Sequence, residues 1–405
     1  MTWPDVEFES IYASPSRNGV YKPKEFHGRG CRIVNMGELF GYNFISNQDM
    51  NRLELNEREL EVNSLEDGDL LFGRRSLVEA GAGKCSLVVE PLDALTFESS
   101  IIRVRLNKKA ANPRFLYYYF RSPQGRGRIR SIVSGTNVKG IRGSDLRRLP
   151  VANPPKDVQD EIANILAAYD DLIENNRRRM ALLEESARLL YREWFVRLRF
   201  PGHEHTRITD GVPEGWGRNT LAELACFLKR GITPAYDDEA EGLVINQKCI
   251  RDGRVNLGLA RNQSKEVKPE RLLQLGDVLV NSTGEGTLGR IAQVKTLLPN
   301  CTVDTHVTIV RPKEGVARHY FGLAVMEWER RFSTMGKGAT NQAELSPTTI
   351  GNAEIVMPSR TLLEQFELFA GPLYEQVTNL VTQNEKHRAA RDLLLPRLMS
   401  GEIAV

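Results

Sequence analysis

Two glycine-rich stretches of this 405-residue chain have spacings that could bind a nucleotide. Gly284-Glu-Gly286-Thr-Leu-Gly289 has the glycine spacing of a dinucleotide-binding loop, in which the pyrophosphate lies on the N-terminus of the next helix. The following residues, 290–295, continue as a strand, so we predict a hairpin turn at this position. Gly83-Lys84 resembles the end of a phosphate-binding loop but lacks its upstream glycine and its Ser or Thr. Neither stretch predicts a nucleotide site.

One further motif could carry catalytic chemistry. Asn153-Pro154-Pro155 matches the start of the motif with which DNA amino-methyltransferases hold a flipped base, but Lys156 occupies the aromatic position. We interpret the segment as the start of a helix, and a methyltransferase with a divergent site remains an alternative. His306 is interpreted as a core histidine on a strand. The sequence shows no nucleophile triad, paired carboxylates or metal-ligand spacing, so we predict no catalytic and no metal-binding residues.

Polar loops that combine cations with amides favour DNA binding. Lys and Arg neutralise phosphates or pair with guanine, whereas Asn and Gln pair with adenine. Residues 103–148 also contain thirteen Lys or Arg and one acid, which favours a polyanionic partner. We predict contacts with double-stranded DNA from Arg74, Arg75, Lys84, Thr136, Asn137, Lys139, Arg142, Arg290, Lys337, Thr340, Asn341 and Gln342.

The elements that would position these loops occur twice. Each copy has a Gly-Asp strand, a strand ending in Arg, an aromatic helix and a Gly/Thr/Asn loop, in the same order. The strands begin at Gly68 and Gly276, and the aromatic helices at Phe115 and Tyr320. We predict an α/β (α+β) fold with two tandem domains of mixed sheet and helix, residues 1–155 and 216–358.

Each domain is followed by a long helix with a heptad pattern, over residues 156–198 and 359–400. The first helix is acidic early and basic late, and the second has the same bias, so antiparallel packing would pair opposite charges. Asn176 and Asn384 on the apolar seam would help to fix the register. We predict an antiparallel coiled coil whose interface contains Ile162, Tyr169, Ile173, Asn176, Met180, Leu183, Leu190, Leu373, Val377, Leu380, Asn384 and Leu394.

The composition is that of an ordinary globular protein, with 41% apolar and 26% charged residues and a net charge of +3. Five scattered cysteines without a CxxC pair indicate reduced thiols, and neither a signal peptide nor an apolar run long enough to span a membrane is seen. We therefore predict a cytoplasmic protein without a membrane partner. Residues 199–215, rich in Gly, Pro and His, are predicted to be a linker.

The chain resembles the specificity subunits of type I restriction-modification enzymes. The resemblance covers nearly the whole sequence, and four segments at the ends of the long helices and the start of the second domain carry it. They are Pro154-Pro-Lys-Asp-Val-Gln159, Tyr191-Arg-Glu-Trp-Phe195, Pro213-Glu-Gly-Trp216 and Arg391-Asp-Leu-Leu-Leu-Pro-Arg-Leu-Met-Ser-Gly401. The resemblance implies two target-recognition domains that read the halves of a bipartite, asymmetric DNA target, separated by the coiled coil.

The resemblance also implies partners and cofactors. The coiled coil would dock two methyltransferase subunits that hold S-adenosylmethionine, and translocase-nuclease subunits would add ATP and Mg²⁺ in the full complex. This chain would bind no cofactor and would not be an enzyme. The second domain lacks the basic block of the first, which puts a symmetric phosphate clamp in doubt. A coiled-coil scaffold without DNA binding is a further alternative.

Overall fold

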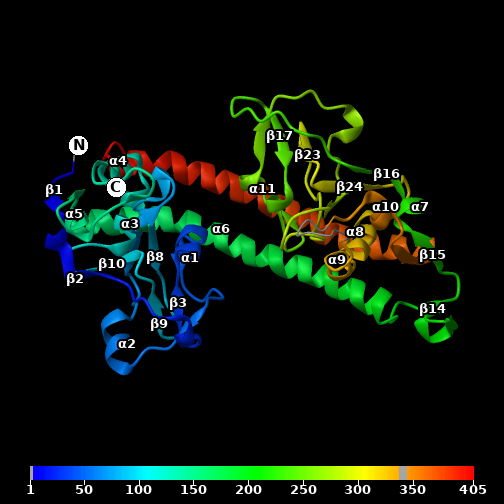
Figure 1. The fold of residues 1–405 in the computed structure, drawn as a ribbon, viewed down its shortest axis with the longest axis horizontal. Helices are drawn as coiled ribbons and strands as arrows, with labels where there is room; N and C mark the ends of the chain where they lie inside the picture. Colours follow the sequence, from blue (N-terminus) through cyan, green and yellow to red (C-terminus); the bar gives the residue numbers. More distant parts are fainter. Residues whose placement is uncertain (1–2, 337–343) are drawn as a thin grey trace. The chain divides into compact units, whose positions relative to one another are not determined.

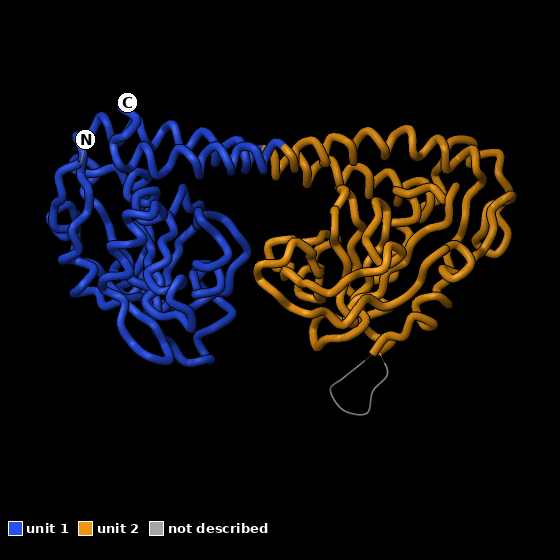
Figure 2. Tube along the Cα trace, turned by 90° about the horizontal axis from the view of Figure 1, so that it is seen from above, with its two compact units in different colours: residues 1–175, 383–405 blue, residues 176–382 orange. Residues whose placement is uncertain are grey.

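The computed structural model describes residues 3–336 and 344–405. These residues form two compact units, which Figure 2 distinguishes by colour. Unit 1 comprises residues 1–175 and 383–405, and unit 2 comprises residues 176–382. The boundary falls within both long helices, so each unit contains one part of each helix.

The main sheets of the two units have matching strand orders. In unit 1 the order is β2-β10-β6-β8-β4, formed by Tyr12–Asn18, Ile101–Leu106, Leu70–Gly73, Cys85–Val88 and Phe44–Ile45. In unit 2 the order is β16-β24-β21-β22, formed by Ala225–Arg230, Val307–Pro312, Val278–Asn281 and Ile291–Gln293. The strands pair antiparallel, except that β4 is parallel to β8.

A smaller sheet accompanies each main sheet, again with matching pairing. In each, the central strand has one antiparallel and one parallel neighbour. The orders are β5-β3-β9 (Arg52–Leu53, His27–Val34, Leu95–Phe97) and β20-β17-β23 (Arg261–Gln263, Gly242–Ile245, Cys301–Val303). Two-stranded ladders also join β1 to β12 (Asp5–Glu7, Pro150–Ala152) and β15 to β25 (Gly217–Thr220, Glu354–Met357). This correspondence confirms the duplication predicted from the sequence.

Alternating side chains of each main sheet form two cores. Leu70 and Phe72 of β6 pack with the helical side of unit 1, whereas Leu71 packs on the opposite face against residues of the smaller sheet. Val278 and Val280 of β21 face the helices of unit 2, and Leu279 faces the smaller sheet. This alternation follows from the two-residue period of a β-strand. Each unit is therefore layered as helices, main sheet and smaller sheet.

The aromatic segments form helices as expected. Asn112 caps α3 (Pro113–Arg121), because its Oδ1 accepts hydrogen bonds from the N–H groups of Arg114 and Phe115 at 2.8 and 3.3 Å. The remaining helices of unit 1 are α1 (Met36–Gly41), α2 (Glu57–Asn63), α4 (Pro123–Ser131) and α5 (Gly143–Arg147) (Figure 1). In unit 2 they are α7 (Leu221–Leu224), α8 (Arg318–Met326), α9 (Glu329–Phe332) and α10 (Pro347–Gly351).

Each main sheet has an equivalent ion pair, in which the aspartate is buried. In β10, Arg105 donates from Nε and Nη2 to the two carboxylate oxygens of Asp69, both at 2.8 Å. In β24, Arg311 binds Asp277 with the same atoms and the same distances. The Gly-Asp strand and the strand ending in Arg, predicted from the sequence as parts of the repeat, are hydrogen-bonded neighbours in each main sheet. The bidentate ion pair is a further contact between them.

The long helices α6 (Lys156–Tyr191) and α11 (Arg360–Met399) pack antiparallel within each unit. In unit 1, Nδ2 of Asn384 donates to the carbonyl of Ile173 at 3.3 Å, and Leu398 shares a core with Ile162. In unit 2, Trp194 packs on Phe366 with ring centroids 6.0 Å apart, after α6 has ended in a π-helical turn at Arg192–Val196. Among the described residues, every helix is too short or too polar to cross a membrane.

One buried acid on α6 connects the helix to the rest of each unit. In unit 1, Asp170 accepts a hydrogen bond from the hydroxyl of Tyr118 at 2.7 Å and pairs with Arg391 of α11. In unit 2, Glu184 accepts from Nζ of Lys295 and Nε of Arg254, each at 2.9 Å. Burial opposes ionisation of Glu184, but these two cations outweigh it and lower the pKa of the carboxyl. The sequence analysis did not find either acid.

The segment predicted as a linker has local structure. Residues 203–205 form a 3₁₀ turn, and β13 (Ile208–Thr209) pairs antiparallel with β14 (Val212–Pro213). Asp210 and Gly211 lie at positive φ in the tight turn between these two strands. Such short strands leave no periodic signal in a sequence, which is why none was expected.

Candidate nucleic-acid interface

The two polar loops of the first domain meet in the structure. The chain between β6 and β8 contains β7 (Arg75–Ser76), which pairs antiparallel with β11 (Lys139–Gly140). A hydrogen bond of 3.0 Å from the N–H of Ile141 to the carbonyl of Arg74 continues this ladder. Arg74, Arg75, Lys139 and Arg142, predicted from separate stretches of sequence, therefore belong to one surface.

The turn of the second loop presents the predicted polar residues to solvent. Ser134 and Gly140 exchange two backbone hydrogen bonds of 2.9 Å, which close the loop at its base. Gly135 lies at φ +103°, and a Cβ there would meet the carbonyl oxygen of Val138 at 2.2 Å, so only glycine suits this turn. Thr136 and Asn137 are both exposed at its tip.

A basic hollow of about 320 Å³ lies beside this ladder in unit 1. Four guanidinium-bearing residues line it, namely Arg17, Arg74, Arg142 and Arg147. Within the described part of the chain, only Arg147 of these four has an acidic partner, Glu9 at 3.4 Å. The concentration of positive charge suits a phosphate group. The sequence analysis missed Arg17 and Arg147, because only the pairing of β2 with β10 and the position of α5 bring them here.

Lys84 has a different environment from the other predicted cations. Its Nζ donates to the carbonyl of Phe40 at 2.6 Å and lies 5.7 Å from the centre of that residue's ring. Burial and then the nearby Arg121 lower the pKa of this ammonium. This hydrogen bond uses one of the three N–H donors of the ammonium, so Lys84 can contact a phosphate only from the position in which the Phe40 carbonyl holds it.

Several cations of the basic block of residues 103–148 are used within the fold. Arg103 is buried, with its Nη1 hydrogen-bonded to the carbonyl of Ser64 at 2.9 Å, and Arg105 belongs to the sheet ion pair. Arg126 donates to backbone carbonyls of the loop before β8, and Arg128 pairs with Asp5 at 2.5 Å. A count of basic residues therefore overstates the positive charge available to a partner.

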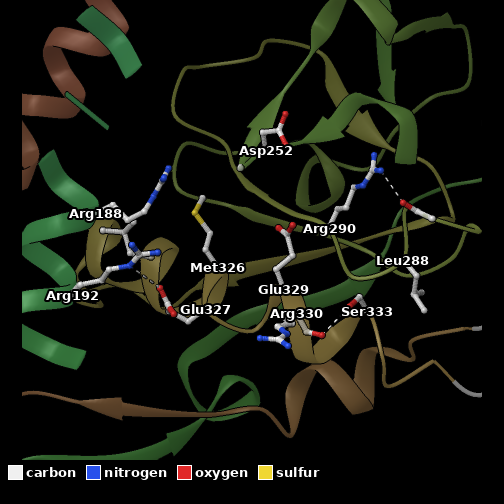
Figure 3. A pocket seen from close by; sticks show the side chains of 13 residues that line it. Arg188, Arg192, Asp252, Leu288, Arg290, Met326, Glu327, Glu329, Arg330 and Ser333 are labelled. Carbon is white, nitrogen blue, oxygen red and sulfur yellow. Dashed lines mark hydrogen bonds and ion pairs between the residues drawn. The ribbon is translucent and has the colours of Figure 1, made fainter. Parts of the chain in front are cut away.

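In unit 2, Arg290 lines a hollow of about 650 Å³ (Figure 3). Its Nη2 donates to the carbonyl of Gly286 at 2.8 Å. The other charged residues of this hollow have mixed signs, and they are Arg188, Arg192, Asp252, Glu327, Glu329 and Arg330. The glycine-rich stretch before Arg290 connects β21 to β22, which confirms the predicted hairpin in place of a nucleotide-binding loop.

Other residues of unit 2 depart from expectation or lie outside the description. His306 occupies an exposed turn, where its Nδ1 shares a hydrogen bond of 2.6 Å with Oγ1 of Thr283, so its interpretation as a core histidine was wrong. The turn between β23 and β24 that contains His306 is too short for a sequence pattern to distinguish it from a strand. Lys337, Thr340, Asn341 and Gln342, predicted as DNA contacts, lie outside the described residues.

Equivalent positions of the two units carry different chemistry. When the two units are aligned on their Arg–Asp pairs, Arg74 of unit 1 is equivalent to Ser282 of unit 2, and Asn18 is equivalent to Arg230. Ser282 is fully buried and bonds Oγ1 of Thr308 at 2.6 Å. Arg230 pairs with Glu344 at 2.5 Å and is thereby neutralised. The two units therefore differ at Arg74 and Asn18, whereas Arg17 of the basic hollow has a cationic equivalent in Lys229.

The twelve predicted coiled-coil residues all lie on covered sides of α6 and α11. Six are buried, namely Ile162, Ile173, Asn176, Val377, Leu380 and Asn384. The other six are partly buried, namely Tyr169, Met180, Leu183, Leu190, Leu373 and Leu394. Asn384 makes the hydrogen bond to the Ile173 carbonyl described above, as a polar residue that fixes register would.

Asn153, the first residue of the methyltransferase-like motif, is engaged at the start of α6. Its Oδ1 accepts a hydrogen bond from Nε2 of Gln159 at 2.9 Å, and the same Nε2 donates to the carbonyl of Pro154 at 2.8 Å. Oε1 of Gln159 in turn accepts the N–H of Asn112, the cap of α3. The motif therefore joins two helices, which matches its interpretation as a helix start.

Comparisons with known proteins agree with this fold. Residues 38–185 match the family described as the type I restriction modification DNA specificity domain. The type I restriction enzyme MjaIX specificity subunit of Methanocaldococcus jannaschii is 23% identical over 399 residues, covering 95% of this chain and 89% of that protein. The EcoKI specificity subunit of Escherichia coli is 33% identical over 174 residues, which are 42% of this chain and 37% of that one.

A solved structure shares the overall fold. The crystal structure of the type I restriction-modification system S subunit from M. genitalium aligns with a TM-score of 0.56 and 16% identity, covering 98% of this chain and 96% of that one. The chain is therefore similar in sequence to type I restriction enzyme specificity subunits, and it shares its fold with one such subunit of known structure.

Proposed function

We propose that this subunit reads a bipartite, asymmetric target in double-stranded DNA, with each unit contacting one half. The duplicated topology carries this proposal, because the same sheet presents different side chains at equivalent positions in the two units. In unit 1 the Arg-lined hollow and the ladder of β7 with β11 supply phosphate contacts and polar groups for base edges.

The difference between the units supports an asymmetric target. Two identical readers would favour a symmetric site, as repeated DNA-binding modules do. Arg74 of unit 1 is equivalent to the buried Ser282 of unit 2. Asn18 is equivalent to Arg230, whose charge is neutralised by Glu344. The two half-sites should therefore differ in sequence.

The long helices would set the spacer between the halves and dock partners. Both α6 and α11 continue from one unit into the other, which supports a role in spacing. We assign to this pair the docking of two methyltransferase subunits that hold S-adenosylmethionine. Translocase-nuclease subunits using ATP and Mg²⁺ would join in the full complex.

Binding measurements on purified components test this proposal. The subunit in complex with its methyltransferase should bind DNA with an affinity that falls steeply as salt rises, because phosphate contacts release counterions. The subunit alone should not bind S-adenosylmethionine, as followed by calorimetry. Binding of S-adenosylmethionine to the chain alone would favour the methyltransferase alternative. A complex whose affinity for DNA does not change with salt would favour the coiled-coil scaffold.

A further inference from the structure

Three large apolar side chains project from the ladder of β7 with β11. Leu77 is 83% exposed, Val78 63% and Val138 49%. Single exposed apolar residues are ordinary on protein surfaces, but these three occupy two loops that the fold brings together. Ser76 pairs with Lys139, so in the antiparallel register Leu77 and Val138 follow on adjacent strands.

The backbone holds this apolar tip in place. The N–H of Val78 donates to Oγ of Ser76 at 3.1 Å, and the carbonyl of Val78 accepts the N–H of Gly81 at the same distance. On the other loop, the carbonyl of Val138 lies against Gly135, where a Cβ would not fit. The three side chains are therefore presented on a formed scaffold, which lowers the entropy lost when they contact a partner.

Two cations, a hydroxyl and an amide lie next to the tip in the two loops. Arg75 and Lys139 flank it on the two strands, and Thr136 and Asn137 are exposed beside Val138. The one nearby acid in the first loop, Glu79, faces Arg130 at 3.8 Å. An apolar centre within a basic and amide-bearing rim is complementary to a DNA groove, which offers phosphates at its edges and both polar groups and thymine methyl groups on its floor.

We propose that Leu77, Val78 and Val138 form an apolar contact with base edges in one half-site, directed at a thymine methyl group. The proposal rests on the proposed function, because it assumes that unit 1 contacts DNA. Both loops lie within residues 38–185, the part of the chain that matches the DNA specificity domain, which favours DNA over a lipid surface. Arg75 and Lys139 would hold the backbone phosphates on either side.

The first test is the methylated sequence produced by the double variant Leu77→Ser, Val138→Ser in the complex with its methyltransferase. The variant should accept other bases at one or two adjacent positions of one half-site and leave the spacer and the other half unchanged. Leu92→Ser is the matched control, because Leu92 is 81% exposed in the loop at the opposite end of β8. This control should methylate the unchanged target.

The second test replaces each thymine of the affected half-site by deoxyuridine, which removes only the methyl group. One replacement should weaken binding of the native complex about fourfold, the effect of one buried methyl group. The same replacement should leave binding of the double variant unchanged. If the double variant instead loses its base preference at a position with a G·C pair, the assignment to a thymine methyl group is wrong.

Other outcomes separate this inference from the proposed function. If the native complex methylates no two-part target, the proposed function fails. If it does so and the double variant keeps the same target and affinity, only the apolar contact is wrong. Binding of phosphatidylserine vesicles that the double variant loses, with DNA binding intact, would assign the tip to a membrane surface instead.

Discussion

At the scale of residues, Arg74 and Arg142 offer the plainest test of phosphate binding in unit 1. Both line the basic hollow, and neither side chain has an acidic partner among the described residues. Replacing each by alanine should weaken DNA binding equally for all sequences and reduce the slope of log affinity against log salt by about 1 per residue. Titrations of the complex at several salt concentrations would measure this.

Arg58→Ala is the matched control for that pair. Arg58 is exposed on α2, which lies apart from α5 in Figure 1 and contributes no residue to the lining of the hollow. The control should leave the salt slope unchanged. An equal loss of slope in the control and in the hollow variants would contradict the assignment of phosphate contacts to the hollow.

Glu184 offers a second residue-scale prediction, which concerns stability. Its pKa is lowered in the folded protein by two cations, despite burial. A carboxyl with a lowered folded pKa contributes stability above its unfolded pKa, and this contribution disappears as the pH falls through the folded value. Glu184→Gln should therefore destabilise unit 2 by about 3 kcal/mol at pH 7, because it leaves the buried Lys295 without a counter-charge.

Unfolding experiments at a series of pH values would measure this difference. The difference in free energy of unfolding between the native chain and Glu184→Gln should have its full size at pH 7. It should shrink below about pH 4.5, the ordinary pKa of glutamate. Glu375→Gln, a change to an exposed acid of α11, serves as the control. A gap that stays constant from pH 7 to pH 3 would show that the carboxylate charge of Glu184 is not what stabilises the unit.

At the scale of elements, the close approach of glycine to backbone recurs in both units. A Cβ on Gly231 would meet the carbonyl oxygen of Val303 at 1.9 Å, and a Cβ on Gly19 would meet that of Phe97 at 2.1 Å. Gly231→Ala should destabilise unit 2 by about 2–3 kcal/mol through overpacking. Gly371→Ala, within α11 and with nothing within 4 Å, should instead be neutral or stabilise by up to about 1 kcal/mol.

Thermal unfolding of the two variants would decide between these expectations. Loss of stability in Gly231→Ala alone is the result expected from the geometry. Similar behaviour of both variants would mean that the backbone at Gly231 and at Val303 can move apart to accept a methyl group. The equivalent change Gly19→Ala should then be tested in unit 1.

The sequence predicted elements whose signal is repeated or periodic. The heptads of α6 and α11, the aromatic helices and the paired Gly-Asp and Arg strands all belong to this kind. The ladder of β7 with β11 was not predicted, because strands of two residues have no period. The same reason explains why Arg17 and Arg147 escaped notice, since only tertiary structure brings them beside Arg74.

Burial of charge limited the prediction of the site in a different way. Lys84 was predicted to contact DNA, and Arg103 and Arg105 were counted in the basic block that favours a polyanionic partner. The fold uses all three for internal hydrogen bonds or ion pairs. Basic residues on interior strands can carry such roles when an acid or a carbonyl is positioned nearby. Which cations remain exposed depends on partners far away in the chain, and this information is absent from local patterns.

At the scale of the whole molecule, we propose that one chain carries two different DNA readers on a duplicated fold. Antiparallel packing of α6 with α11 occurs within each unit, so each reader is attached to part of both helices. Changes confined to unit 1 should therefore alter one half of the target and leave the other half intact. The variants of the apolar tip provide such a change.

The most direct measurement is methylation-sensitive sequencing of DNA from cells that express this chain together with its cognate methyltransferase, beside cells that express each alone. The account predicts methylated adenines in a two-part, asymmetric sequence with a fixed spacer, seen only when both proteins are present. Methylation produced by this chain alone, or a symmetric target without a spacer, would contradict it.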